Sequence, residues 1–288
     1  MSIIQAEERL GRIPYADTLG VKIEELSEEY ALLRLPHDAA HDNANGTLNG
    51  GATASLINIA GTMAAWTGID MDACPSLRTV DMAVQYQSAG FQEDVLAHAR
   101  VTRRGRDVFF LDVALKTPDD RPVCQGMMIY RGPVYGEHEP RNLAPFEARP
   151  APVEAKTWKS MGMLKGFGEK LEMSSDLICE GFGRIKMAGE TSNQDEQGYV
   201  HDGAIAALAD FGGTVTAWSF FDSWKSIRGS TVGMQLSYAQ PATGEVTCDT
   251  FLEHRNEEAF LSTAAVTEVK TGALVCLGQV SYRLLEPR

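Results

Sequence analysis

One domain-sized pattern occurs twice in this chain. The stretch "NGTLNGGATASLINIAGTMAAW" is followed much later by the closely related "QGYVHDGAIAALADFGGTVTAW". Further matches recur at a constant offset of 152 residues, from Gly46 and Gly198 near one end of the pattern to Tyr130 and Tyr282 near the other. A constant offset over so much of the chain indicates a duplicated domain, and a length of 288 residues suits two domains.

The boundaries of the two copies follow from the segment between them. Residues 132–156 contain several prolines and no periodic apolar pattern, which is typical of an extended, exposed connection. We therefore predict a first domain over residues 1–131, a linker over 132–156 and a second domain over 157–288.

Each copy predicts the same arrangement of one helix and about five strands. An Ala-rich segment that opens with glycine predicts a helix over 50–67 and again over 202–219. Both segments are apolar nearly all round, so we expect buried helices. The segments that follow alternate apolar and polar residues, which is typical of strands. The expected class is α+β, with an antiparallel sheet wrapped around one long helix in each half.

Composition excludes several classes of function. The formal net charge of −13 argues against a nucleic-acid surface, because such surfaces are basic. No apolar run is long enough for a membrane span, and the N-terminal residues lack the pattern of a secretory signal. The cysteines are scattered and odd in number, so reduced thiols and a cytoplasmic location are expected: Cys74, Cys124, Cys179, Cys248 and Cys276.

The residues shared by the two copies resemble the hotdog fold, and specifically the PaaI-like acyl-CoA thioesterases. That family carries Asn, then Gly three residues on, then His-Gly-Gly, with an acid nine residues past the His. The first copy has Asn43, Gly46, Asn49, Gly50 and Asn58 at these positions. The second has Asp195, Gly198, His201, Gly203 and Asp210. Neither copy is complete, because the titratable groups differ between them.

The resemblance implies two tandem hotdog domains that form a pseudo-dimer within one chain. Asp210 lies seven residues beyond Gly203, about 10 Å along a helix axis, so it cannot reach the N-terminus of its own helix. Hotdog dimers place their helices antiparallel, and an acid on one helix then faces the N-terminus of the other. Two composite sites are therefore expected between the halves.

Site one is expected to be the catalytic site, and it combines Asn43, Asn49, Gly50 and Gly51 with Asp210 and Thr231. Asp210 would activate water or attack the thioester directly, and the Gly50 and Gly51 amides would stabilise the oxyanion. Asn43 would position water or the leaving sulfur, and Thr231 would orient the nucleophile. Site two combines Asp195, His201 and Gly203 with Asn58 and Thr79, and it would bind a ligand without turnover or have lost its function.

Several of these residues also fit structural roles. Asp210 could be a hydrogen-bonded structural acid, and His201 could simply cap its helix. Asp202, beside Gly203, fits a complement to the helix dipole. Arg103, Arg104 and Arg106 could contact the phosphates of coenzyme A or form a solvated hairpin turn.

The reaction that these residues predict is hydrolysis of an acyl-CoA thioester, with no metal or redox cofactor. The alternative is a non-catalytic protein that binds acyl-CoA or an acyl carrier. A hotdog enoyl-CoA hydratase fits less well, because that motif places the Asp ahead of the His. The expected partners are a small-molecule acyl-CoA and a second copy of the chain, in a homodimer that resembles a hotdog tetramer.

Overall fold

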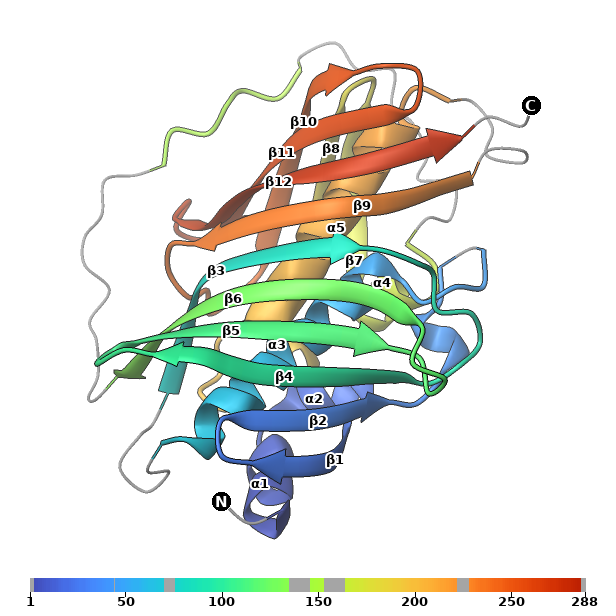
Figure 1. Ribbon diagram of the computed structural model, residues 1–288. Helices are drawn as coiled ribbons and strands as arrows, with labels where there is room; N and C mark the ends of the chain where they lie inside the picture. The colour runs from blue at the N-terminus through green and yellow to red at the C-terminus, as the bar shows by residue number, and fades with distance from the viewer. Residues whose placement is uncertain are drawn as a thin grey trace.

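The computed structural model describes residues 3–43, 45–69, 76–134, 146–152, 164–221 and 228–285. Their strands form one antiparallel sheet of 12 strands, in the order β1-β2-β4-β5-β6-β3-β9-β12-β11-β10-β8-β7 (Figure 1). The sheet curves over two long helices, α3 and α5, which lie against its concave face. This arrangement confirms the tandem hotdog architecture.

The two halves repeat the same series of elements. The first half contains α1 (Ile3–Leu10), α2 (Pro14–Leu19), β1 (Lys22–Ser27), β2 (Tyr30–Leu35), α3 (Gly50–Thr67), β3 (Ser76–Tyr86), β4 (Val95–Arg104), β5 (Val108–Lys116) and β6 (Pro122–Val134). The second half contains α4 (Phe167–Lys170), β7 (Met173–Cys179), β8 (Phe182–Met187), α5 (Asp202–Trp218), β9 (Arg228–Tyr238), β10 (Val246–Arg255), β11 (Ala259–Glu268) and β12 (Leu274–Leu285). Short 3-10 turns precede the long helices, at Ala39–His41 and Thr191–Asn193.

Each half has six strands among its described residues, not the five that the sequence indicates. The additional strands are β1 and β7, which form the two edges of the sheet. β1 reads KIEELS and is mostly exposed, so it lacks the alternation that marks a half-buried strand. Charged residues are common on edge strands because they discourage pairing with other chains.

The halves join through their central strands. β3 pairs with β9 in antiparallel register from Asp81 opposite Ser237 to Gln85 opposite Gly233. The Ser237 hydroxyl also donates a hydrogen bond of 2.8 Å to the Asp81 carboxylate. The apolar core is likewise continuous, because one cluster of buried side chains contains residues from both halves.

The two long helices are buried and lie against each other in opposite directions. A Cβ added to Gly51, at the start of α3, would lie 2.9 Å from the Ala207 Cα in α5. Gly203, at the start of α5, is similarly close to Ser55 in α3. Each helix N-terminus therefore packs against the N-terminal half of the partner helix, and Gly50 reaches Asp210 at the middle of α5.

The predicted linker lies partly outside the described residues. β6 continues to Val134, beyond residue 131 where the first domain is predicted to end. The described stretch 146–152 runs beside β10, where Arg149 donates a hydrogen bond to Glu253 and stacks over the Phe251 ring.

The described residues also bear on the predictions of reduced cysteines and of no membrane span. Cys124, Cys179, Cys248 and Cys276 are buried free thiols, and Cys74 lies outside the described residues. No helix within the described ranges combines the length and apolar character needed to cross a bilayer.

Candidate active site

Asp210 is the central residue of site one. It lies on α5 with only 3% of its surface exposed. The Thr231 hydroxyl, on β9, donates a hydrogen bond of 2.6 Å to its Oδ1. A Cβ at Gly50 would lie 2.8 and 2.9 Å from the two carboxyl oxygens, so only glycine leaves room for this acid. The structure thus brings Asp210, Thr231 and the N-terminus of α3 together.

Burial changes the acidity of this carboxyl group. Loss of hydration raises the pKa of Asp210 to about 6, while the hydrogen bond from Thr231 and the nearby Gly51 backbone N–H act in the opposite direction. A general base works best when its pKa lies close to the working pH. Asp210 is therefore ionised at neutral pH and remains basic enough to accept a proton.

The start of α3 is fixed by two side chains. Asn49 caps the helix, and its Oδ1 accepts a hydrogen bond of 2.8 Å from the Gly51 N–H. The Tyr86 hydroxyl donates to the Gly50 carbonyl at 3.0 Å. The Gly51 amide, which the sequence assigns to the oxyanion, is thus engaged by its own cap, and it can bind a ligand oxygen only by sharing or exchanging that contact.

Asn43 belongs to the loop before α3. Its side-chain N–H₂ donates to the Thr47 hydroxyl at 2.8 Å, and its Oδ1 accepts from the Asn45 N–H. Asp195 has the same place in the second half, where its carboxylate accepts from the backbone N–H groups of Gln197 and Tyr199. Both side chains shape a loop, and the side-chain hydrogen bonds of Asn43 are made within that loop, to Asn45 and Thr47.

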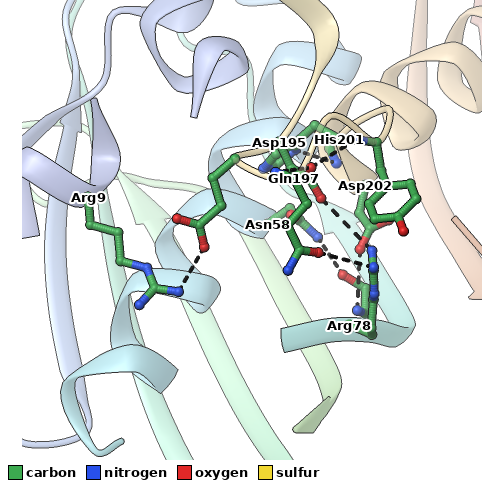
Figure 2. Close-up of polar contacts among 11 residues, drawn as sticks. Arg9, Asn58, Arg78, Asp195, Gln197, His201 and Asp202 are labelled. Carbon is green, nitrogen blue, oxygen red and sulfur yellow. Dashed lines mark hydrogen bonds and ion pairs between the residues drawn. The ribbon is translucent and has the colours of Figure 1, made fainter. Parts of the chain in front are cut away.

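Site two is built from the other pair of helix positions. Asn58, on α3, donates from its Nδ2 to the Thr79 hydroxyl at 3.1 Å. Asp202 is the first residue of α5, and its Oδ2 accepts a hydrogen bond of 3.3 Å from the Thr79 backbone N–H. Figure 2 shows Asn58 and Asp202 close together at the start of α5. Asp202 is placed to complement the dipole of α5, as its sequence position predicts, and its carboxylate also lies in this composite site.

His201 occupies the capping position of α5. Its Nδ1 accepts a hydrogen bond of 3.0 Å from the Gly203 N–H, and its ring stacks on Tyr15 with ring centres 4.9 Å apart. Burial lowers the pKa of His201 to about 3. The imidazole is therefore neutral, and its proton resides on Nε2 because Nδ1 acts as an acceptor.

The rim of site two carries a cation. The Arg78 guanidinium stacks over the Tyr199 ring and donates to the Gln197 side chain at 3.1 Å. It also lies 3.9 Å from the Asp195 carboxylate (Figure 2). Site one has Ser230 at the equivalent position, so the two sites differ in charge at their rims.

The arginines at 103, 104 and 106 lie away from the N-terminus of α3. They occupy the end of β4 and the turn that follows it. A Cβ at Gly68, just beyond α3, would lie 2.9 Å from an Arg104 side-chain nitrogen. Because α3 has 18 residues, its two ends are about 27 Å apart. The structure therefore does not bring Arg104 to the helix end that contributes to site one.

Several residues of the two sites are absent from the predicted set. The hydroxyls of Tyr86 and Tyr238 donate to the carbonyls of Gly50 and Asp202. These tyrosines occupy equivalent positions in the repeat, and that equivalence could have marked them as site residues. Tyr15 and Arg78 come from segments where the sequence copies differ, so no pattern marks them.

Comparison with known proteins supports the class that this geometry defines. Residues 45–124 match the model of the Thioesterase superfamily. A candidate esterase of Halobacterium salinarum is 30% identical over 105 residues, which cover 35% of this chain and 69% of that protein. The chain belongs to the thioesterase superfamily.

Solved structures share the whole tandem architecture. A candidate thioesterase II of Thermobifida fusca aligns with a TM-score of 0.65 at 13% identity, over 95% of this chain and 98% of that one. Acyl-CoA thioesterase II TesB2 of Mycobacterium marinum aligns with a TM-score of 0.61 at 11% identity, over 94% and 96% of the two chains. At these identities the similarity establishes the fold.

Proposed function

We propose that this protein is an acyl-CoA thioesterase, and that site one hydrolyses the thioester. The observation that carries the proposal is the position of Asp210, a buried carboxylate held by Thr231 against the N-terminus of the opposite helix. A helix N-terminus favours a developing negative charge on a carbonyl oxygen, and a carboxylate can activate the attacking water.

The proposed reaction has a simple balance of bonds and protons. Asp210 accepts a proton as a water molecule attacks the thioester carbon, and the carbonyl oxygen gains charge near the Gly50 amide. The C–S bond then breaks, and the proton passes from Asp210 to the leaving sulfur. The products are a carboxylic acid and a free thiol. Direct attack by Asp210 would give the same products through an anhydride that water hydrolyses.

The neighbours of Asp210 have supporting parts in this proposal. The hydrogen bond from Thr231 fixes the rotation of the carboxyl group, so that one oxygen remains available to water. Asn49 and Tyr86 hold the first turn of α3 in place. The geometry of site one does not involve the three arginines of the β4–β5 turn. We propose only that they contact the phosphates of coenzyme A: Arg103, Arg104 and Arg106.

Release of free thiol from a panel of short, long and aromatic acyl-CoAs tests the proposal. We expect turnover by the wild-type protein, and we expect Asp210→Asn to lose at least half of kcat with little change in KM. Asp112→Asn is the matched control, because Asp112 is exposed on β5. Binding of acyl-CoA without thiol release would favour the non-catalytic alternative, and an unchanged kcat in Asp210→Asn would reject the assignment to site one.

A further inference from the structure

The two composite sites share three equivalent hydrogen bonds. In each, the residue before the helix accepts from the second amide, as Asn49 does from Gly51 and His201 from Gly203. In each, a tyrosine donates to the carbonyl of the first helical residue. In each, a threonine bonds to the facing position of the partner helix, Asp210 or Asn58. The scaffold of site one is thus present in site two.

The two sites differ by an exchange of two residues. Site one has Gly50 at the helix start and Asp210 on the facing helix, whereas site two has Asp202 at the helix start and Asn58 on the facing helix. A side chain at position 50 would begin 2.8 Å from the Asp210 carboxylate, so the two acid positions exclude each other sterically. At these two positions each site therefore holds one carboxylate, on the facing helix in site one and at the helix start in site two.

The carboxylate of site two lies beside the equivalent threonine. Asp202 accepts from the Thr79 backbone N–H at 3.3 Å, just as Asp210 accepts from the hydroxyl of Thr231. Burial raises the pKa of Asp202, while Thr79 and Arg78 act in the opposite direction and Asp195 adds to the increase. A carboxylate with a raised pKa accepts a proton more readily than an exposed Asp does.

A second, independent observation comes from His201. Its side chain is only 5% exposed, and its ring proton is on Nε2 because Nδ1 accepts from Gly203. The Nε2–H of this neutral ring is a hydrogen-bond donor on the residue that caps α5, and a polar ligand atom at the start of α5 can accept from it.

We propose that site two is a second thioester-hydrolysing centre in which Asp202 replaces the facing-helix carboxylate. This inference rests on the proposed function of site one. Asp202 accepts a proton from water as it attacks an acyl thioester, the C–S bond breaks, and the proton passes to the leaving sulfur. The N-terminus of α5 and the His201 Nε2–H stabilise the carbonyl oxygen as it gains charge. The chain then has two active sites with different carboxylate geometry.

Thiol release from the acyl-CoA panel by four proteins tests this inference: wild type, Asp210→Asn, Asp202→Asn and the double variant. We expect each single variant to keep at least about a tenth of wild-type kcat, and the double variant to fall below about one hundredth. Complete loss in Asp210→Asn alone overturns the second centre and leaves the proposed function intact. A double variant as active as wild type overturns both, and a wild-type protein without turnover overturns the proposed function itself.

Relocation of the acid separates catalysis from folding. In the Asp210→Asn background, we would combine Asp202→Gly with Asn58→Asp, which rebuilds site two in the pattern of site one. We expect this protein to keep the activity of Asp210→Asn, whereas Asp202→Gly alone in that background loses it. A folded relocation variant without activity, judged by circular dichroism, contradicts the inference. Asp112→Asn is the control with unchanged activity.

Discussion

At the scale of single residues, Asp210 combines a functional and a destabilising property. Burial raises its pKa to about 6, above the value of about 3.9 expected in the unfolded chain. The native state therefore binds the Asp210 proton more tightly than the unfolded state does. The contribution of this proton to the free energy of unfolding is fully present below about pH 4 and is lost as the pH rises through about 6. A shift of about two pKa units corresponds to about 3 kcal/mol.

The stability of Asp210→Asn should consequently depend on pH relative to wild type. At pH 4 we expect the two proteins to have similar free energies of unfolding. Between about pH 4 and pH 6 the variant should become the more stable, by up to about 3 kcal/mol, and the difference should be constant above that range. Denaturant unfolding at several pH values measures it, with Asp112→Asn as the exposed control. A difference that is independent of pH contradicts this account.

At the scale of helices and strands, the close antiparallel crossing of α3 and α5 depends on small residues. The position of a Cβ on Gly51 is 2.9 Å from both the Cα and the Cβ of Ala207. Atoms of the backbone cannot rotate away as a long side chain can. The crossing therefore has little tolerance for added volume, although alanine normally favours a helix over glycine.

Gly51→Ala should accordingly destabilise the protein. We expect a loss of about 1 to 3 kcal/mol, because the helices must separate to accept the methyl group. Gly244→Ala is the control, since a Cβ there would meet nothing within 4 Å. Thermal unfolding by circular dichroism compares the two, and a Gly51→Ala protein as stable as the control would mean that the helices separate at no cost.

The helices were the most predictable elements of this chain. The segment predicted over 50–67 is α3, and the segment predicted over 202–219 ends one residue earlier, at Trp218. Their glycine starts, caps and continuous apolar composition are local features. The edge strand β1 was missed because its alternation is weak. The direction of the Asp202 side chain depends on Thr79, more than a hundred residues away, which no local pattern encodes.

At the scale of the whole molecule, the halves share a sheet, a core and both composite sites. The pairing of β3 with β9 leaves no break between the halves, and each site takes residues from both. The antiparallel pairing of helices was predictable from the resemblance, because Asp210 is too far from its own helix start. The contacts of Asn43 and Arg104 were not, because they depend on loop and hairpin geometry.

Because the halves share one sheet and one core, we expect a substitution that destabilises one half to destabilise the other as well. Leu208, on α5, is fully buried, and Leu208→Ala should cost about 3 kcal/mol. We expect the amides of β4 and β5 in the first half to lose as much hydrogen-exchange protection as those of β10 and β11. Leu261→Ala, on the partly exposed face of β11, is the control. Retained protection in β4 and β5 would show that the halves unfold separately.

The exchange of Gly50 and Asp210 for Asp202 and Asn58 has a consequence for how such a protein can change over time. In a homodimer of identical chains, every substitution appears in both composite sites at once. An acid introduced beside an existing acid would therefore disrupt both sites together. Fusion of the two copies removes that coupling. One composite site can then acquire a new arrangement of charge, and with it a different substrate preference, while the other site keeps the original chemistry.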